Sequence, residues 1–167
     1  MNILVLQSGG TTPVINATLS GVLFGANIKS KPCKVFTAKN GVYGAIKGEI
    51  KEISSDKSFA KSILNIPGSS ITGTSRVGFL NEKDISQLIK SLKNFSIDAL
   101  INIGGNGTLQ QSKFISTSIG DKISVASCPK TVDNDLGDNE LNDVFFNPGY
   151  PSCINWWDKH LNFLNIE

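Results

Sequence analysis

Short, uninterrupted runs of apolar residues alternate with longer segments of helical periodicity, and this alternation constrains the fold more than any other feature. The apolar runs at residues 3–6, 98–103 and 123–126 are typical of strands buried on both faces of a parallel sheet. Residues 33–38 predict a further strand, and residues 46–53 a short edge strand. Strands that alternate with helices predict an α/β fold: a doubly wound, Rossmann-like, mostly parallel sheet with helices on both faces.

The helices are predicted between these strands. In residues 14–23 apolar side chains recur at helical spacing, with Thr12 as the N-cap and Pro13 as the first helical residue. The other predicted helices cover residues 58–64, 81–94, 108–116 and 151–167, and loops are expected at residues 40–44 and 67–76. No linker-like stretch divides the 167 residues, so a single domain is expected.

The composition argues against several classes of protein. The formal net charge of +2 is too small to indicate a nucleic-acid or membrane surface. No apolar run approaches the ~18 residues of a membrane span, and the N-terminus lacks the basic segment of a signal peptide. The three cysteines are widely spaced, which favours reduced thiols in a cytoplasmic chain over disulfides or a zinc site.

Glycine turns follow two of the predicted strands and lead into helices. Gly9 and Gly10 follow the first strand, and Gly104, Gly105 and Gly107 follow the strand at residues 98–103. Free amide groups and the positive end of the helix dipole make such a junction an anion site. Neither turn matches the Walker A or the dinucleotide motif, and a tight turn without a ligand explains either one equally well.

An acidic segment follows the strand at residues 123–126. Thr131, Asp133 and Asp135 alternate, so an extended backbone would point all three side chains the same way. Two carboxylates that face one site repel each other unless a metal, a lysine or a proton intervenes. Ligands bind at the carboxyl ends of strands in such sheets, which favours function, although an ordinary polar loop has the same composition.

Arg76 is the single arginine of the chain and lies in a loop rich in glycine, serine and threonine. Its guanidinium suits bidentate contact with a phosphate, and the alternative is a solvated surface arginine. The two glycine turns and the acidic segment follow three different strands and would converge at one edge of the sheet. This convergence, more than any single motif, favours a phosphate-handling site.

Two tryptophans and the single histidine lie in the last predicted helix. Trp156 and Trp157 have large apolar faces that either pack under the sheet or await a partner. His160 is interpreted as a helix-surface residue rather than a catalytic one.

Together the motifs resemble the phosphofructokinase family. Residues 7–17 are similar to its N-terminal Ser-Gly-Gly…Asn donor loop, and residues 73–76 to its Gly-Ser-Ala/Ser-Arg segment. Residues 104–108 resemble its Gly-Gly-Asp-Gly-Ser/Thr motif, and residues 129–135 its Pro-Gly/Lys-Thr-Ile/Val-Asp-Asn/Gly-Asp motif. The four motifs occur in the family's order and cover nearly the whole chain.

The resemblance implies phosphoryl transfer, with Mg²⁺, from diphosphate or ATP to the 1-hydroxyl of fructose 6-phosphate, giving fructose 1,6-bisphosphate. By the family pattern Asp133 is the base for the sugar hydroxyl, Thr131 contacts the sugar, and Arg76 stabilises charge on the transferring group. Asn106 and Asp135 would support the metal. The residues implied in binding the donor phosphates are Gly9, Gly10, Arg76, Gly105, Gly107, Thr108 and Lys130.

The signals for the donor conflict. Lys130 and the sequence of residues 7–16 resemble the diphosphate-dependent branch. A lysine at position 130 can neutralise diphosphate and occupy space that an adenosine needs. Gly107 instead resembles the small residue of ATP users, and Asn106 replaces the family's usual Asp, which removes a charge beside the metal. On the basis of the N-terminal motif at residues 7–16 we expect diphosphate as the donor, with ATP as the alternative.

Chains of this family are much longer and continue into a second lobe that carries most contacts to the sugar phosphate. The resemblance therefore implies that residues 1–167 are the N-terminal donor-binding lobe. The missing half would come from a complementing second lobe or from a homo-oligomer, since the family builds its sites across subunits; otherwise the chain is a truncated or degenerate copy. The alternative is a non-catalytic regulatory module that binds a phosphate or nucleotide.

Overall fold

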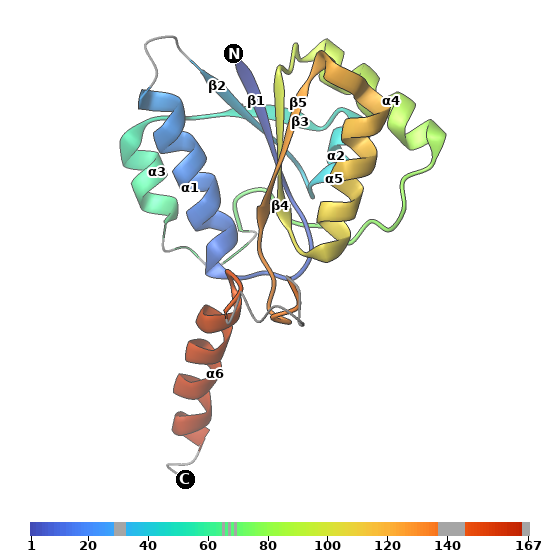
Figure 1. Ribbon diagram of the computed structural model, residues 1–167. Helices are drawn as coiled ribbons and strands as arrows, with labels where there is room; N and C mark the ends of the chain where they lie inside the picture. Colours follow the sequence, from blue (N-terminus) through green and yellow to red (C-terminus); the bar gives the residue numbers. More distant parts are fainter. Residues whose placement is uncertain (29–32, 65, 67, 69, 137–145, 165–167) are drawn as a thin grey trace.

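A computed structural model describes residues 1–28, 33–64, 66, 68, 70–136 and 146–164 of the chain. These residues form a five-stranded sheet in the order β3-β2-β1-β4-β5 (Figure 1). The strands are β1 (Asn2–Gln7), β2 (Lys34–Ala38), β3 (Ile50–Ile53), β4 (Ala99–Gly104) and β5 (Ser124–Pro129). Strand β3 runs antiparallel at one edge and the other pairings are parallel, so the predicted mostly parallel sheet is confirmed.

Helices cover both faces of the sheet, as the alternation of strands and helices predicted (Figure 1). One face carries α1 (Pro13–Ile28) and α3 (Lys57–Ile63). The other face carries α2 (Val42–Lys47), α4 (Glu82–Asn94) and α5 (Asn106–Ile119). A 3-10 turn, η1 (Gly120–Lys122), leads into β5, and the last helix is α6 (Tyr150–Leu164).

The uninterrupted apolar run of β1 is explained by its burial on both faces. Ile3 and Val5 pack in the core beneath α1 and α3, whereas Leu4 and Leu6 pack in the core beneath α2, α4 and α5. Successive side chains of a strand point to opposite faces, so a central strand is apolar along most of its length. The chain continues from β1 to β2 on one side and places β4 on the other, so the strand order reverses between β1 and β4. Such a reversal opens a crevice at the carboxyl ends of the two strands.

The region around residues 40–53 differs from the prediction. Residues 42–47, predicted as a glycine loop and the start of a strand, form α2, and β3 begins only at Ile50. A Cβ added to Gly44 would lie 1.9 Å from the backbone oxygen of Lys39. Glycine therefore serves here for close approach of a helix to the turn that follows β2, and not for a loop.

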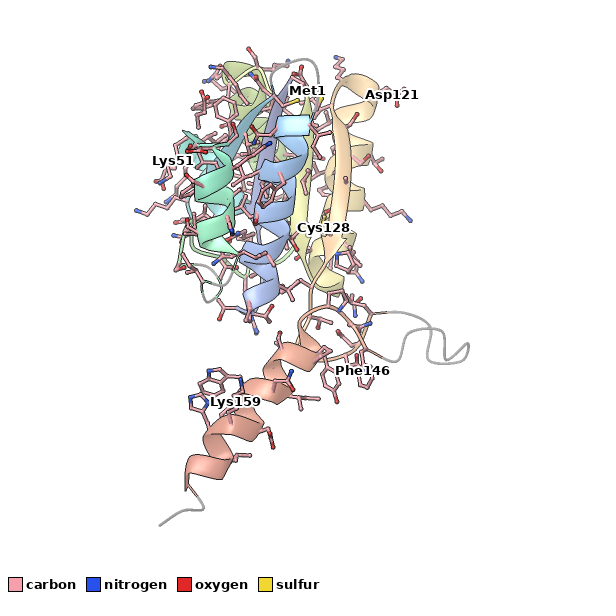
Figure 2. All side chains as sticks on the ribbon, turned by 90° about the vertical axis from the view of Figure 1, so that its left-hand side faces the viewer. Met1, Lys51, Asp121, Cys128, Phe146 and Lys159 are labelled. Carbon is pink, nitrogen blue, oxygen red and sulfur yellow. The ribbon has the colours of Figure 1, made fainter. Side chains whose placement is uncertain are left out.

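Helix α6 extends away from the sheet (Figure 1), and Lys159 on it stands clear of the other elements (Figure 2). Trp156 and Trp157 are 52% and 54% exposed, so the interpretation that they pack under the sheet is wrong for this structure. His160 lies on the exposed surface, as predicted, and stacks on the Trp156 ring. No helix of the described ranges is both long and apolar enough to cross a bilayer. Parts of two predicted elements lie outside the described residues. These are Pro67 and Ser69 of the predicted loop at 67–76, and residues 165–167 of the predicted helix at 151–167.

Helix α4 begins with a reciprocal capping box. The Asn81 side chain accepts a hydrogen bond from the Asp84 amide at 2.9 Å, and the Asp84 carboxylate accepts one from the Asn81 amide at 3.1 Å. Each bond satisfies a backbone donor that has no partner inside the helix.

We expect Asn81→Ala to lower the free energy of unfolding by about 1 kcal/mol, because the Asp84 amide loses its acceptor. The measurement is urea denaturation followed by circular dichroism. Gln87→Ala, at an exposed position of the same helix, is the matched control and should change stability by less than about 0.5 kcal/mol. Equal losses in the two variants would contradict the role of the cap.

Candidate functional site

A cavity of about 280 Å³ opens at the carboxyl ends of β1, β4 and β5, where the strand order reverses. It is lined by loops that follow these three strands and by the segment around Arg76. Every residue that the sequence named as a site residue lines this cavity: Gly9, Gly10, Arg76, Gly105, Asn106, Gly107, Thr108, Lys130, Thr131, Asp133 and Asp135. Their individual roles stay predictions. Ser8, Val77, Gln111 and Val132 also line it and were not named from the sequence.

The Lys130 ammonium lies beneath the first glycine turn. Lys130 is 2% exposed, and its Nζ donates a hydrogen bond to the Gly10 carbonyl at 2.6 Å. Gly9 has φ +77°, a left-handed conformation that favours glycine, and an added Cβ there would come within 3.4 Å of the same Nζ. The buried ammonium therefore contacts this turn, and Lys130 lines the cavity.

Burial lowers the pKa of Lys130 below its usual value of 10.5. The neighbouring Arg76 guanidinium lowers this pKa further, while Asp133 raises it. The two cations therefore share one cavity at some electrostatic cost, and a bound anion would relieve that cost.

Arg76 is held in place by a segment that attaches to the β1 turn. Ser8 and Ser75 form an isolated parallel bridge, and the Gly9 amide donates to the Ser75 carbonyl at 3.2 Å. The Thr74 hydroxyl donates to the Gly9 carbonyl at 2.9 Å. These bonds bring the Arg76 side chain close to Gly10: its Nη2 lies 3.8 Å from the position that an added Cβ on Gly10 would take. The hydroxyl-rich composition of this loop was the signal for these contacts, although the sequence did not assign them.

A hydrogen bond between two buried side chains, Thr72 and Gln7, also holds this segment in place. The Thr72 hydroxyl donates to Gln7 Oε1 at 2.7 Å, and both side chains are buried. Gln7 is the last residue of β1, so this bond ties the loop directly to the central strand.

Helix α5 starts at the cavity with its first turn facing the space. Gly105 is the N-cap, and its carbonyl accepts hydrogen bonds from the Thr108 and Leu109 amides. The first amides of a helix have no acceptor inside it, and Gly105, Asn106 and Gly107 line the cavity. A polyanion placed here would meet free amide groups and the positive end of the helix dipole.

The acidic segment is bent, so the predicted extended backbone is wrong. The chain bends at Val132 and Asp133, and Asn134 has φ +55°. The Asp133 amide donates to Thr131 Oγ1 at 3.1 Å, and the Thr131 hydroxyl donates to Asp135 Oδ1 at 2.8 Å. Such local side-chain bonds compete with an extended backbone. Thr131 is buried and the two aspartates are exposed, yet all three line the same cavity.

The segment's two ends are fixed by other parts of the chain. The Thr131 amide donates to the Pro148 carbonyl at 2.9 Å, and the buried Asn147 exchanges two hydrogen bonds of 2.8 Å with the Leu136 backbone. On the cavity side, Asn106 Nδ2 donates to both Asp135 Oδ2 and the Asp135 carbonyl, each at 2.8 Å.

A second, apolar hollow of about 400 Å³ adjoins the cavity and shares Val77, Gly107 and Gln111 with it. Phe79 and Phe114 line the hollow and are 97% and 45% exposed. An added Cβ on Gly107 would meet no atom within 4 Å. Sequence reasoning missed this hollow, and an isolated phenylalanine after the hydroxyl-rich loop was the signal that could have found it.

Comparison with known proteins shows which family the chain resembles. The family model described as "Phosphofructokinase" matches residues 2–156. A probable ATP-dependent 6-phosphofructokinase of Malacoplasma penetrans is 30% identical, and the match covers 99% of this chain and 51% of the relative. A pyrophosphate–fructose 6-phosphate 1-phosphotransferase of Xanthomonas campestris pv. campestris is 32% identical, over 81% of this chain and 34% of the relative.

Solved structures give the same result. A pyrophosphate-dependent phosphofructokinase from Nitrosospira multiformis superposes with a TM-score of 0.74 at 28% identity. The match covers 89% of this chain and 37% of that structure's chain. The chain therefore spans about half the length, or less, of the relatives it matches.

The lowered pKa of Lys130 predicts a pH dependence of stability. Between that lowered pKa and about 10.5 the unfolded chain binds more protons at this site than the folded chain, so its contribution raises the free energy of unfolding as pH rises. At lower pH both states are protonated and the contribution is constant. We expect Lys130→Met to remove this rise, measured by chemical denaturation from about pH 7 to about pH 10. Lys113→Met, at an exposed position of α5, is the control and should retain it.

Proposed function

The chain belongs to the phosphofructokinase family, and from this premise we propose that residues 1–167 form the phosphoryl-donor-binding lobe of such an enzyme. The proposed reaction transfers a phosphoryl group from diphosphate or ATP to the 1-hydroxyl of fructose 6-phosphate. The single observation that carries the proposal is the cavity, where two glycine turns, Lys130, Arg76 and Asp133 meet.

The side chains supply the two kinds of assistance that the reaction needs. The Asp133 carboxylate accepts the proton of the sugar hydroxyl, and the sugar oxygen attacks the terminal phosphorus of the donor. The bond from that phosphorus to the bridging oxygen breaks, and phosphate or ADP leaves. A positioned base is worth about 10²–10⁴ in rate. An arginine on the transferring group is worth about 10³–10⁵, which is the role proposed for Arg76.

Donor phosphates have three groups of partners in the cavity. These are the Gly9–Gly10 turn, the first turn of α5 with Thr108, and the Lys130 ammonium. The ammonium carries three donors and uses one on the Gly10 carbonyl, so others remain for a phosphate oxygen. Thr131, which lies between Lys130 and Asp133, is the proposed contact to the sugar.

The donor set fits Mg²⁺ that arrives with the phosphates. Among the described residues no group of three or more His, Cys, Asp or Glu side chains could hold a metal ion by itself. Mg²⁺ is usually held by one or two carboxylates together with substrate phosphates and water. The Asp135 carboxylate and the Asn106 amide oxygen border the cavity and would hold it. When bound, the ion neutralises charge that develops on the phosphoryl oxygens.

One feature of the structure supports ATP as a second candidate donor beside the diphosphate expected from the sequence. The apolar hollow next to Gly107 has the aromatic lining that an adenine ring requires. The argument that Lys130 fills the space of an adenosine has no support here, because Lys130 turns toward Gly10 and does not line the hollow.

Helix α6 supports the proposal that a second lobe completes the site. Ile154, Trp157 and Leu161 lie at helical spacing on α6 and are all about half exposed. An exposed apolar surface of this kind marks an interface. The relatives are about twice as long as this chain, so the proposed occupant is the half that they have in addition, supplied as a complementing lobe or within a homo-oligomer.

We expect Asp133→Ala to lower turnover of fructose 6-phosphate by a factor of about 10²–10⁴. If the chain alone is inactive, the second lobe is added to the assay as a separate polypeptide. Donor affinity, measured by calorimetry with Mg²⁺, should change little because Asp133 contacts the sugar and not the donor. Asp121→Ala, at the opposite end of the molecule (Figure 2), is the control and should leave turnover unchanged. Donor binding without turnover, even with a second lobe present, would favour the regulatory module instead.

The two donors are distinguished by Phe79→Ala. Stacking of a base on an aromatic ring is worth about 1–3 kcal/mol, so ATP affinity should fall several-fold to about a hundredfold, while diphosphate affinity stays the same. Phe79 is 97% exposed, so its removal should not affect folding. Phe24→Ala on α1, outside the hollow, is the matched control. Unchanged ATP affinity in Phe79→Ala would eliminate the hollow as a base site.

A further inference from the structure

The acidic segment is held to α5 by the side-chain amide of Asn106 and not by a charged side chain of that helix. Asn106, the first residue of α5, donates from its single Nδ2 to the Asp135 carboxylate and to the Asp135 carbonyl, each at 2.8 Å. An amide nitrogen carries two hydrogens, so this geometry uses both of them. Asn106 is itself exposed, and its side chain fills no part of the core.

From Asp135 the bonds run on to the proposed base. Asp135 Oδ1 accepts from the Thr131 hydroxyl at 2.8 Å, and Thr131 Oγ1 accepts from the Asp133 amide at 3.1 Å. The rotation of the Thr131 side chain is fixed by these two bonds, and the backbone position of Asp133 follows from it. Asn106 is therefore linked to Asp133 through two intervening residues, Asp135 and Thr131.

A carboxylate at position 106 could not make these contacts. It has no hydrogen to donate, and it would lie within hydrogen-bond distance of the Asp135 carboxylate, where like charges repel. Two such carboxylates come together only when a proton, a metal ion or another cation lies between them. The amide removes both problems, since it supplies donors and carries no charge.

We propose that Asn106 is a positioning residue that orders the segment of Thr131, Asp133 and Asp135 without a bound cation. In this chain the segment is organised before Mg²⁺ arrives, and the ion is needed only for the charge of the donor phosphates. The role of Asp133 in this statement rests on the proposed function, but the ordering of the segment does not.

Amide hydrogen exchange measures the ordering directly, in the absence of any substrate. The Asp133 amide is the reporter, because its acceptor Thr131 Oγ1 depends on the bonds from Asn106 through Asp135. The Leu136 amide is the internal reference, because its acceptor is Asn147 Oδ1, which those bonds do not include. In the unaltered chain the exchange rate of Asp133 should be the same with and without millimolar MgCl₂.

Two variants separate positioning from a general structural effect. In Asn106→Asp, exchange of the Asp133 amide should be about tenfold faster without Mg²⁺ and should return to the original rate when Mg²⁺ bridges the two carboxylates. In Asn106→Ala the rate should rise by a similar factor and Mg²⁺ should not restore it. An aspartate at the start of a helix is favoured by the dipole, so Asn106→Asp should not unfold α5. Asn155→Asp, at an exposed position of α6, controls for the added charge.

Three outcomes would overturn the proposal. They are original exchange rates in both variants without Mg²⁺, fast exchange in Asn106→Asp that Mg²⁺ does not slow, and a Mg²⁺-dependent rate in the unaltered chain. A separate turnover assay with fructose 6-phosphate tests the proposed function, so its failure leaves the exchange result intact and the two can be distinguished.

Discussion

The hydrogen bond from the buried Lys130 ammonium to the Gly10 carbonyl joins loops that are 120 residues apart in the chain. Lys130 also donates its amide to the Gly104 carbonyl, so one residue contacts the turns that follow both β1 and β4. Parallel strands bring these turns to one edge of the sheet, but only to within the width of the crevice. The buried lysine lines the cavity and links the two segments across this crevice.

The site separates residues that hold its shape from residues that face the solvent. Lys130, Thr131 and Thr108 are buried, whereas Arg76 and Asp133 are exposed. Buried polar groups with satisfied bonds give a rigid frame. Phosphoryl transfer depends on positioning and on electrostatic stabilisation, both of which are stronger when water is excluded. Arg76 and Asp133 leave one side of this cavity open to solvent, and the proposed second lobe would cover it.

Much of this arrangement followed from the sequence, for definable physical reasons. The central strands are buried on both faces and are mostly apolar, so their positions could be predicted from the sequence. The rule that parallel strands end at the same edge of a sheet then predicted which loops would meet. What escaped prediction depended on contacts between distant or polar groups. Gly44 resembled a loop residue because nothing local reveals that the Lys39 carbonyl approaches it. The bend at Asp133 depends on the Thr131 hydroxyl, and alternation of side chains carries no information about such a bond.

The open surroundings of Gly107 have a consequence for how such a protein can diverge. Its backbone is not in the left-handed region, and a side chain at this position would meet no neighbouring atom within 4 Å. Glycine inside a helix is less favourable than almost any replacement, so folding exerts no pressure to keep it. A larger side chain at position 107 would therefore project toward the cavity and the apolar hollow without disturbing the fold, so under the proposed function this position can change with the donor.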